Sequence, residues 1–228
     1  MTKSELQKMF DCAVHIGHRT HKWDPRARKF IFGERNGIHI IDLEKTAVYL
    51  EKALDFLNKA GKEGKTVLFV STKPQSIKLL EDAAKDCGMP YVVSKWIPGL
   101  LTNFGTIKKR IKYLSDMKEQ EKSGEFEKYT KNEASKLRKE MDKLQISLGG
   151  VENMKSLPDV LFALDVVRDE IVVKEAKKIG IPVVGIVDTN SDPNSVDYPI
   201  PGNDDALKSL EYFVGKISET LKKTSKKV

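Results

Sequence analysis

The chain has 228 residues and a net charge of +7, with 39% hydrophobic and 32% charged residues. That length suffices for one sizeable core with an appendage, and the composition is typical of a globular protein with a highly charged surface. No apolar run reaches the roughly 18 residues of a membrane span, and the N-terminus lacks the apolar segment of a signal peptide. We therefore expect a cytoplasmic protein without membrane contact. Cys12 and Cys87 form no C-x-x-C motif, so neither a cysteine zinc site nor a disulfide framework is indicated.

Basic charge is concentrated in three parts of the chain. The ranges 13–37, 106–148 and 216–228 each carry a net charge of +4, which leaves the remainder acidic at −5. The basic residues therefore lie on appendages, and this favours a polyanionic partner that touches several protrusions. For any single range, solubilising lysines are the alternative interpretation.

Residues 1–42 are predicted to form a helix and a basic β-hairpin arm. The helix would begin with a capping box at Ser4, end near Gly17 and have one apolar face, consisting of Leu6, Met9, Phe10 and Ala13. Pro25 favours extended structure in the polar stretch that follows. Asn36-Gly37 separates two apolar runs and is the favoured pair for a type I′ turn, because both residues accept a positive φ.

Residues 43–103 are predicted to begin an α/β domain. Asp42 can cap a helix with an inward stripe made of Ala47, Leu50, Leu54 and Leu57. The continuous apolar run 66–70 is typical of a strand buried on both faces of a parallel sheet. A helix through Cys87 should end at Gly88, and a short strand is expected at 91–93.

Residues 104–150 interrupt this alternation and are predicted to form an inserted coiled-coil hairpin. Apolar residues recur at heptad spacing in both halves: Ile107, Ile111, Leu114, Leu137, Met141, Leu144 and Leu148. Ser123-Gly124 should end the first helix, and Thr130 with Glu133 forms a capping box for the second. Each helix of about 19 residues would be about 28 Å long, so the hairpin should project from the domain.

Residues 151–228 are predicted to complete the α/β domain. We expect strands at 160–165 and 183–187, with a helix at 169–179 between them. A turn-rich loop at 188–204 should then lead into the last helix, at 207–221. Short strands alternating with helices predict a parallel sheet with helices on both faces. The tail 222–227 is expected to fray.

Polar residues follow the predicted strands, where an enzyme site would be built. In open parallel sheets, ligands bind beyond the carboxyl ends of the strands. The residues at these ends are Ser71, Thr72, Asp165, Asp188, Thr189 and Asn190. A nucleotide- or Mg²⁺-dependent α/β enzyme is therefore the alternative function. Against it, the chain has no G-x-G-x-x-G and no G-x-x-x-x-G-K-[ST] motif, and Asp and Asn also shape turns.

Carboxylates and histidines give a weaker indication of a metal. Five aspartates fall within 18 residues, namely Asp188, Asp192, Asp197, Asp204 and Asp205. The interpretation we favour is structural: Asp204 or Asp205 caps the last helix, and Asp192 begins a turn. His15, His18 and His21 recur every third residue, but Gly17 among them argues against a helical zinc site. No cofactor is required, and the candidate ligands of a structural divalent cation are His18, Asp188, Asp204 and Asp205.

RNA binding is the function that the residue types favour most. The arm interleaves cations with Trp23 and Phe30, which supplies donors for phosphates and rings for stacking. No RRM, KH or zinc-finger signature is present, so we expect contact with folded RNA by shape and backbone, and no DNA binding. The candidate RNA-binding residues are Arg19, Lys22, Trp23, Arg26, Arg28, Lys29, Arg35, Lys95, Asn103, Lys108, Lys109, Arg110 and Lys112.

Ordered sequence blocks along nearly the whole chain resemble one family. They include Val14-His-Ile-Gly-His-Arg-Thr-His-Lys-Trp-Asp-Pro25 and Ile200-Pro-Gly-Asn-Asp-Asp-Ala206, with further blocks at 30–46, 67–73, 96–104, 147–150, 157–159 and 187–193. These blocks resemble the bacterial-type family of the second protein of the small ribosomal subunit. Pro98-Gly99 stands where that family usually has Gly-Gly, which leaves the shape of this loop open.

The resemblance implies a non-enzymatic, structural protein of the small ribosomal subunit that binds ribosomal RNA. It also implies a flavodoxin-like α/β domain with an inserted coiled-coil hairpin. Neighbouring small-subunit proteins are the expected partners, including the large messenger-binding first protein of that subunit.

Overall fold

The computed structural model describes residues 3–225, and its centre is a five-stranded parallel sheet. The strands in spatial order are β5 (Tyr91–Val92), β4 (Val67–Val70), β6 (Val160–Ala163), β7 (Val183–Val187) and β8 (Tyr198–Pro201). Counted from first to fifth along the chain, this order is 2-1-3-4-5, which is the flavodoxin-like order. The predicted fold class is therefore confirmed.

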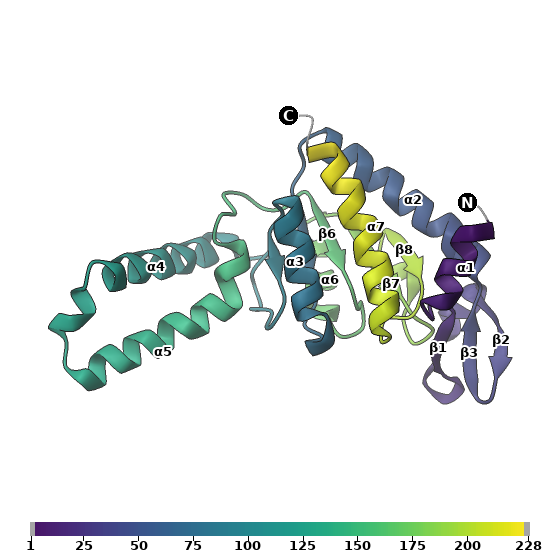
Figure 1. Cartoon of the computed structure of the whole chain (residues 1–228), viewed down its shortest axis with the longest axis horizontal. Helices are drawn as coiled ribbons and strands as arrows, with labels where there is room; N and C mark the ends of the chain where they lie inside the picture. The colour runs from purple at the N-terminus through teal and green to yellow at the C-terminus, as the bar shows by residue number, and fades with distance from the viewer. Residues whose placement is uncertain (1–2, 226–228) are drawn as a thin grey trace.

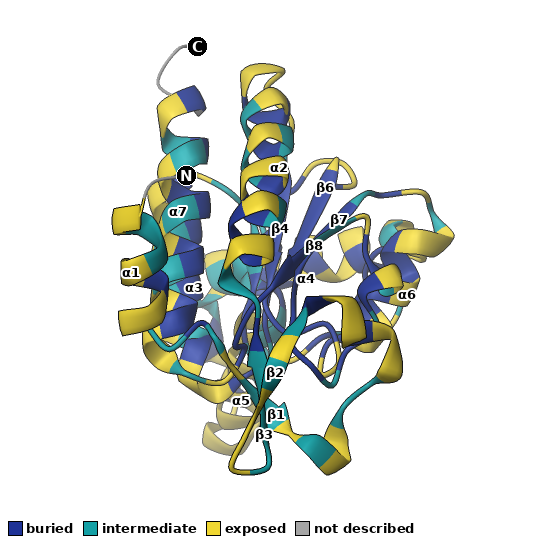
Figure 2. Cartoon of the chain, turned by 90° about the vertical axis from the view of Figure 1, so that its right-hand side faces the viewer, coloured by how far each residue is buried: buried dark blue, intermediate teal, exposed yellow. Residues whose placement is uncertain are grey.

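Helices cover both faces of this sheet. One face packs against α2 (Leu43–Lys62), α3 (Ile77–Cys87) and α7 (Leu207–Ser225), and the other against α6 (Glu170–Lys178) and the base of the helical insert. In β4, Val67 and Phe69 belong to the first core, while Leu68 and Val70 belong to the second. The unbroken apolar run of this strand follows from burial on both sides, and Figure 2 shows the strands buried between partly exposed helices.

The N-terminal arm is a three-stranded antiparallel sheet preceded by α1 (Lys3–Asp11). Its strands are β1 (Ile16–Arg19), β2 (Ile31–Arg35) and β3 (Ile38–Ile41), in the order β1-β3-β2. The predicted turn is confirmed, since Asn36 and Gly37 have φ of 53° and 75°. Strand β1 was not expected, because His and Arg side chains in a short polar stretch give no alternating apolar pattern.

Four expectations for this arm are wrong. Helix α1 ends at Asp11 and not near Gly17, since Ala13 turns the chain with a φ of 59°. Ser4 lies inside α1 and does not cap it, and Phe10 is 54% exposed. Pro25 begins a 3-10 helix, Pro25–Phe30, because the fixed φ of proline suits a first helical position as well as extended chain.

The insert is an antiparallel pair of helices, α4 (Phe104–Lys122) and α5 (Lys131–Leu148), joined by a 3-10 turn, Glu125–Lys128. Gly124 ends α4 with a φ of 77°, and the capping box of Thr130 and Glu133 is present, so both predicted boundaries are confirmed. Figure 1 shows this pair at one end of the long axis and the arm at the other. The supercoil expected from the heptad spacing stays a prediction, as does the division into domains.

Two further expectations need correction at the C-terminal end. The loop 188–204 contains the edge strand β8, which two prolines disguise; proline is tolerated there because an edge strand has an unpaired side. Residues 222–225 continue α7, and Lys226 and Lys227 lie outside the described residues. Within the described part of the chain, no helix has the length and apolarity needed to cross a bilayer.

Candidate functional site

A buried lysine occupies the carboxyl edge of the sheet, where flavodoxin-like folds bind ligands. Lys73 follows β4 and is 6% exposed. Its Nζ lies 2.9 Å from Asp165, 3.0 Å from Asp204 and 2.8 Å from Asp205, and it also donates to the Asp204 carbonyl at 2.6 Å. A side chain of the protein itself therefore provides the counter-charge for these three carboxylates.

The charge of Lys73 is stabilised by its partners. Burial lowers the pKa of this ammonium, but the nearby Asp204, Asp205 and Asp165 outweigh burial and raise its pKa above the ordinary value. Although burial raises the pKa of Asp205, the ammonium of Lys73 holds it below its usual range overall. Lys73 is thus a permanent cation that joins the ends of β4, β6 and β8.

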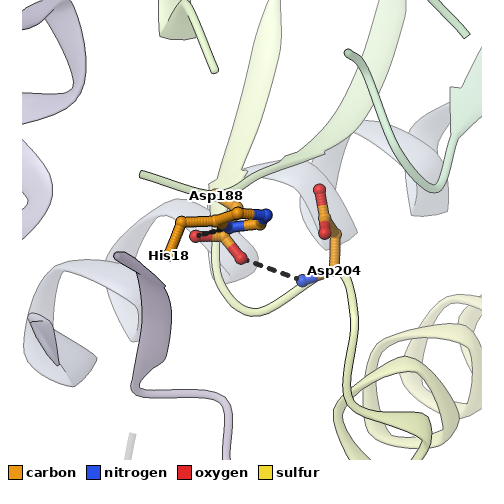
Figure 3. A group of neighbouring side chains, drawn as sticks. All are labelled: His18, Asp188 and Asp204. Atoms are coloured by element: carbon orange, nitrogen blue, oxygen red, sulfur yellow. Dashed lines mark hydrogen bonds and ion pairs between the residues drawn. The ribbon is translucent and has the colours of Figure 1, made fainter. Parts of the chain in front are cut away.

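A second cluster lies beside this lysine and consists of His18, Asp188 and Asp204 (Figure 3). His18 Nδ1 lies 3.2 Å from Asp188 Oδ1, and its Nε2 lies 3.4 Å from Asp205 Oδ2. The hydrogen bond with Asp188 raises the pKa of His18. One ligand atom of each of the three residues lies within 4.8 Å of the others, so three of the four predicted metal ligands meet in one place, with Asp205 at its rim.

Asp204 has an unusual environment within this cluster. Its side chain is buried, and its Oδ2 has no hydrogen-bond partner among the described residues. Burial, reinforced by Asp188 and Asp165, raises the pKa of this carboxyl to about 7. A buried carboxylate oxygen without a donor is costly, so a proton or a cation at this atom would stabilise the site.

The N-terminal arm closes the carboxyl edge of the sheet. The His18 backbone N–H donates to Thr189 Oγ1 at 2.9 Å, and the Asp24 N–H donates to the Thr189 carbonyl at 2.8 Å. A Cβ at Gly17 would lie 2.6 Å from Thr189 Cγ2, so only glycine allows this approach. The predicted strand-end residues are therefore covered by the chain itself.

The side chain of Asn203 makes three hydrogen bonds that the sequence did not predict. It accepts from the backbone N–H groups of Asp205 and Ala206 before α7, so the expectation that Asp204 or Asp205 caps this helix is wrong. Its Nδ2 also donates to the Ala13 carbonyl and so holds the arm. The expected turn at Asp192 is confirmed, since its side chain accepts from the Asn194 N–H.

The remaining strand-end residues make internal contacts as well. Ser71 Oγ lies 2.7 Å from Ser76 Oγ, and Thr72 Oγ1 donates to Asp169 at 2.8 Å. Burial raises the pKa of Asp169 to about 6 against the opposing hydrogen bonds from Thr72. These polar groups hold loops in place through contacts within the protein.

Glu175 of α6 is a polar centre at the base of the helical insert that the sequence did not indicate. It is 9% exposed and accepts hydrogen bonds from four residues, Trp96, Gly99, Leu101 and Thr102. Nothing distinguishes it in sequence from the exposed acids of an amphipathic helix. For Lys73, the sequence offers one indication of a role in the site, namely its position three residues after the buried strand β4.

The candidate RNA-binding cations lie in two separated groups. The arm group consists of Arg19, Lys22, Arg28, Lys29 and Arg35, all exposed. The root group is at the start of α4 and consists of the exposed Lys108, Lys109, Arg110 and Lys112, and the exposed Lys95 and Asn103 lie in the loop before it. Among residues 3–225, none of these cations forms an ion pair with an acid.

Two candidates in the arm are already engaged by other residues. Arg26 is held by Asp24 and Asp192, with both contacts at 2.6 Å. Trp23 is half-buried, and its ring packs 5.2 Å from that of His39. Their availability to RNA is therefore lower than that of the two cation groups.

Comparison with known proteins identifies the family. Residues 9–224 match the family model described as ribosomal protein S2. The chain is 50% identical to small ribosomal subunit protein uS2 of a Nitratiruptor species over 216 residues, which cover 95% of this chain and 81% of the relative. It is 48% identical to the uS2 protein of Dictyoglomus thermophilum, over 95% of this chain and 88% of the relative. The chain belongs to the ribosomal protein S2 family.

Family membership decides between the two predicted functions. Members of the ribosomal protein S2 family are structural, non-enzymatic components of the ribosome, so the chain is a structural constituent of the small ribosomal subunit. The enzyme alternative has no support. The closed carboxyl edge agrees with this, because the residues that an enzyme would need there hold the arm and the loops in place.

Proposed function

We propose that this protein binds ribosomal RNA through the arm group and the root group at once. The observation that carries the proposal is a set of exposed cations without acidic partners among the described residues. One group lies on the N-terminal arm and the other at the base of the insert, on opposite sides of the parallel sheet (Figure 1). A cation that no acid of the protein neutralises can neutralise phosphate, which dominates affinity for nucleic acid. Basic groups on two projections suit folded RNA, which is recognised by shape and backbone.

Co-sedimentation with small ribosomal subunits tests the root group. Replacing Lys108, Lys109, Arg110 and Lys112 by alanine should weaken incorporation into subunits, because four phosphate contacts are lost. The matched control removes four exposed lysines from the rest of the insert, namely Lys122, Lys128, Lys131 and Lys136. It has the same change in charge, so equal incorporation of the two variants would show that the root group is no specific contact.

We also infer that a protein neighbour binds the apolar groove between α1, the arm and the start of α2. The groove is lined by Leu6, Phe10, His15, Phe32, Ile40 and Leu43. Phe32 is 79% exposed and Phe10 is 54% exposed, with its ring stacked on His15 at 4.3 Å. Adjacent exposed aromatic rings are typical of a protein-binding site. We propose the large messenger-binding first protein of the subunit as its occupant.

Binding measurements with that purified protein test this inference. Phe32→Asp should weaken binding by at least about tenfold, because it places a charge in the apolar contact. The control is Ile146→Asp on α5, where an equally apolar side chain is 61% exposed. Equal affinity of the wild type and the Phe32→Asp variant would remove the groove from the list of contacts.

We further propose that His18, Asp188 and Asp204 hold a structural divalent cation. The buried Oδ2 of Asp204 lacks a partner among the described residues, and the three ligand atoms converge within 4.8 Å. One imidazole nitrogen with carboxylate oxygens suits Zn²⁺ better than Mg²⁺, which prefers oxygen ligands alone. The cation would join the arm to the ends of β7 and β8.

Metal content of the purified protein tests the cation. Elemental analysis after dialysis against Zn²⁺ or Mg²⁺ should give about one Zn²⁺ per chain, and Zn²⁺ should raise the melting temperature by mass action. Asp204→Asn should abolish both effects, while Asp192→Asn, in the same loop, should retain them. A wild-type protein that retains no metal would contradict the proposal.

A further inference from the structure

The side chain of Glu175 gathers the loop from which the helical insert departs. Its Oε1 accepts from Trp96 Nε1 at 3.1 Å and from the Gly99 N–H at 2.7 Å. Its Oε2 accepts from the Leu101 N–H at 3.1 Å and from both the N–H and the hydroxyl of Thr102 at 3.2 Å. One carboxylate therefore fixes the seven residues 96–102, and α4 begins two residues later.

The charge of Glu175 is suited to this task. Burial raises the pKa of this carboxyl, but the hydrogen bonds from Gly99, Trp96, Thr102 and Leu101 outweigh burial and lower its pKa overall. All five donors point at the two carboxylate oxygens. A glutamine at this position would have only one acceptor oxygen, and its NH₂ group would face the donors of the other oxygen.

Most of the insert projects away from the domain, and its attachments lie at its base. Helices α4 and α5 pack mainly against each other, and α5 continues directly into the 3-10 turn Gly149–Val151, which lies against β5. A side chain at Gly150 would overlap the Tyr91 carbonyl there. The insert thus joins the domain through the loop held by Glu175, through this turn, through the packing of its base in the second core and through the ion pair of Lys118 with Glu152. The direction of the projecting helices depends on these attachments at their base.

We propose that Glu175 is a positioning residue that sets the direction of the helical insert relative to the α/β domain. It contacts no candidate RNA-binding cation but holds the loop between Lys95 and Asn103, and so presents the root group at one fixed angle. This inference concerns the protein alone and does not require that the root group binds RNA.

Double electron–electron resonance measures the distance between two spin labels, and this distance reports the direction of the insert. Glu127→Cys at the tip of the insert and Lys208→Cys on α7 provide exposed label sites, in a protein whose Cys12 and Cys87 are replaced by alanine. The wild-type distance distribution should be narrow. Glu175→Gln should broaden it to about twice that width, because the loop then opens locally while the domain stays folded.

A control separates positioning from loss of stability. Val173→Ala removes a buried side chain from the same helix but keeps all five hydrogen bonds to Glu175, so it should lower the melting temperature and leave the distribution narrow. Trp96→Phe removes one donor but keeps an aromatic ring in the core, so it should broaden the distance distribution to a smaller extent. This variant is used in place of Glu175→Gln if that variant does not fold. A distribution no broader than that of Val173→Ala in either variant would overturn the proposal.

Incorporation into small subunits then separates this inference from the proposed function. A broadened distance distribution together with weaker incorporation supports both. A broadened distribution with normal incorporation supports the positioning role of Glu175 and counts against an RNA contact at the root group.

Discussion

The buried ammonium of Lys73 contacts carboxylates that follow β6 and β8, and so it links three loops of the protein. The ammonium and the carboxylates of Asp165 and Asp204 lose their hydration in this place, and their mutual contacts, with that of the exposed Asp205, compensate for the loss. Removing the cation leaves Asp165 and Asp204 as buried acids facing each other without a counter-charge. The stability of the carboxyl edge therefore depends on one side chain.

We expect Lys73→Met to lower the free energy of unfolding by about 3–5 kcal/mol, the usual cost of leaving buried charges unpaired. Urea denaturation at pH 7.5 measures the change. The control is Lys208→Met on the exposed side of α7, which should change stability by less than about 0.5 kcal/mol. A Lys73→Met variant as stable as this control would show that the carboxylates are satisfied in another way.

Asp169 gives the protein a pH dependence of a defined sign. The folded state holds its proton up to a pKa of about 6, against 3.8 for the free side chain. Folding therefore favours the protonated carboxyl of Asp169. The contribution of this group to the free energy of unfolding is lost as the pH rises from about 4 to above 6, and the loss is at most about 3 kcal/mol.

We therefore expect Asp169→Asn to be more stable than the wild type at pH 8 and similar to it at pH 4, since the amide keeps the acceptor for the Thr72 N–H. The difference between the two unfolding free energies, measured from pH 4 to pH 8, isolates this group from other titrating residues. A difference that does not change with pH would contradict a raised pKa of Asp169.

Residues such as these mark the limit of what the sequence predicts about the site. His18, Asp188, Asp204 and Asp205 could be named as candidates because their type and their place after strands carry information. Lys73 and Glu175 depend on partners up to 132 and 79 residues away along the chain, which no local pattern encodes. The arm over the sheet edge was equally out of reach, because it rests on contacts between Thr189 and the chain near Gly17.

At the scale of elements, local chemistry was the more reliable guide. The Asn36-Gly37 turn, the Asp42 cap of α2 and the Thr130 capping box all form as expected, because each depends on neighbours within four residues. Strand β8 was missed for the opposite reason: proline disfavours strands locally, and only its place at the sheet edge permits it.

Thr130 offers a test of the independence of the insert. Thr130→Ala removes the hydroxyl that accepts from the Glu133 N–H, which should cost about 1 kcal/mol. Because α5 packs mainly against α4, hydrogen exchange should speed up by about fivefold in the first turn of α5 and stay unchanged in β4, β6 and β7. Faster exchange in those strands as well would mean that the insert and the domain unfold together.

At the scale of the molecule, the two cation groups lie on opposite sides of the parallel sheet. The arm and the insert lie at opposite ends of the long axis, with the parallel sheet between them (Figure 1). The two groups have no contacting residue of the protein in common. Their contributions to the free energy of binding one RNA should therefore add. The rigidity of the sheet and of the loop held by Glu175 fixes the span between them.

This additivity is testable through the salt dependence of binding to small-subunit ribosomal RNA. The arm variant replaces Arg28, Lys29 and Arg35 by alanine, and the root variant replaces Lys108, Lys109, Arg110 and Lys112. Each lost phosphate contact should reduce the slope of log affinity against log salt by about 0.7–0.9. The combined variant should show the sum of both reductions, since one RNA then loses contacts at both ends. If the combined variant binds no more weakly than the arm variant, the two ends do not engage the same RNA, and the insert serves another partner.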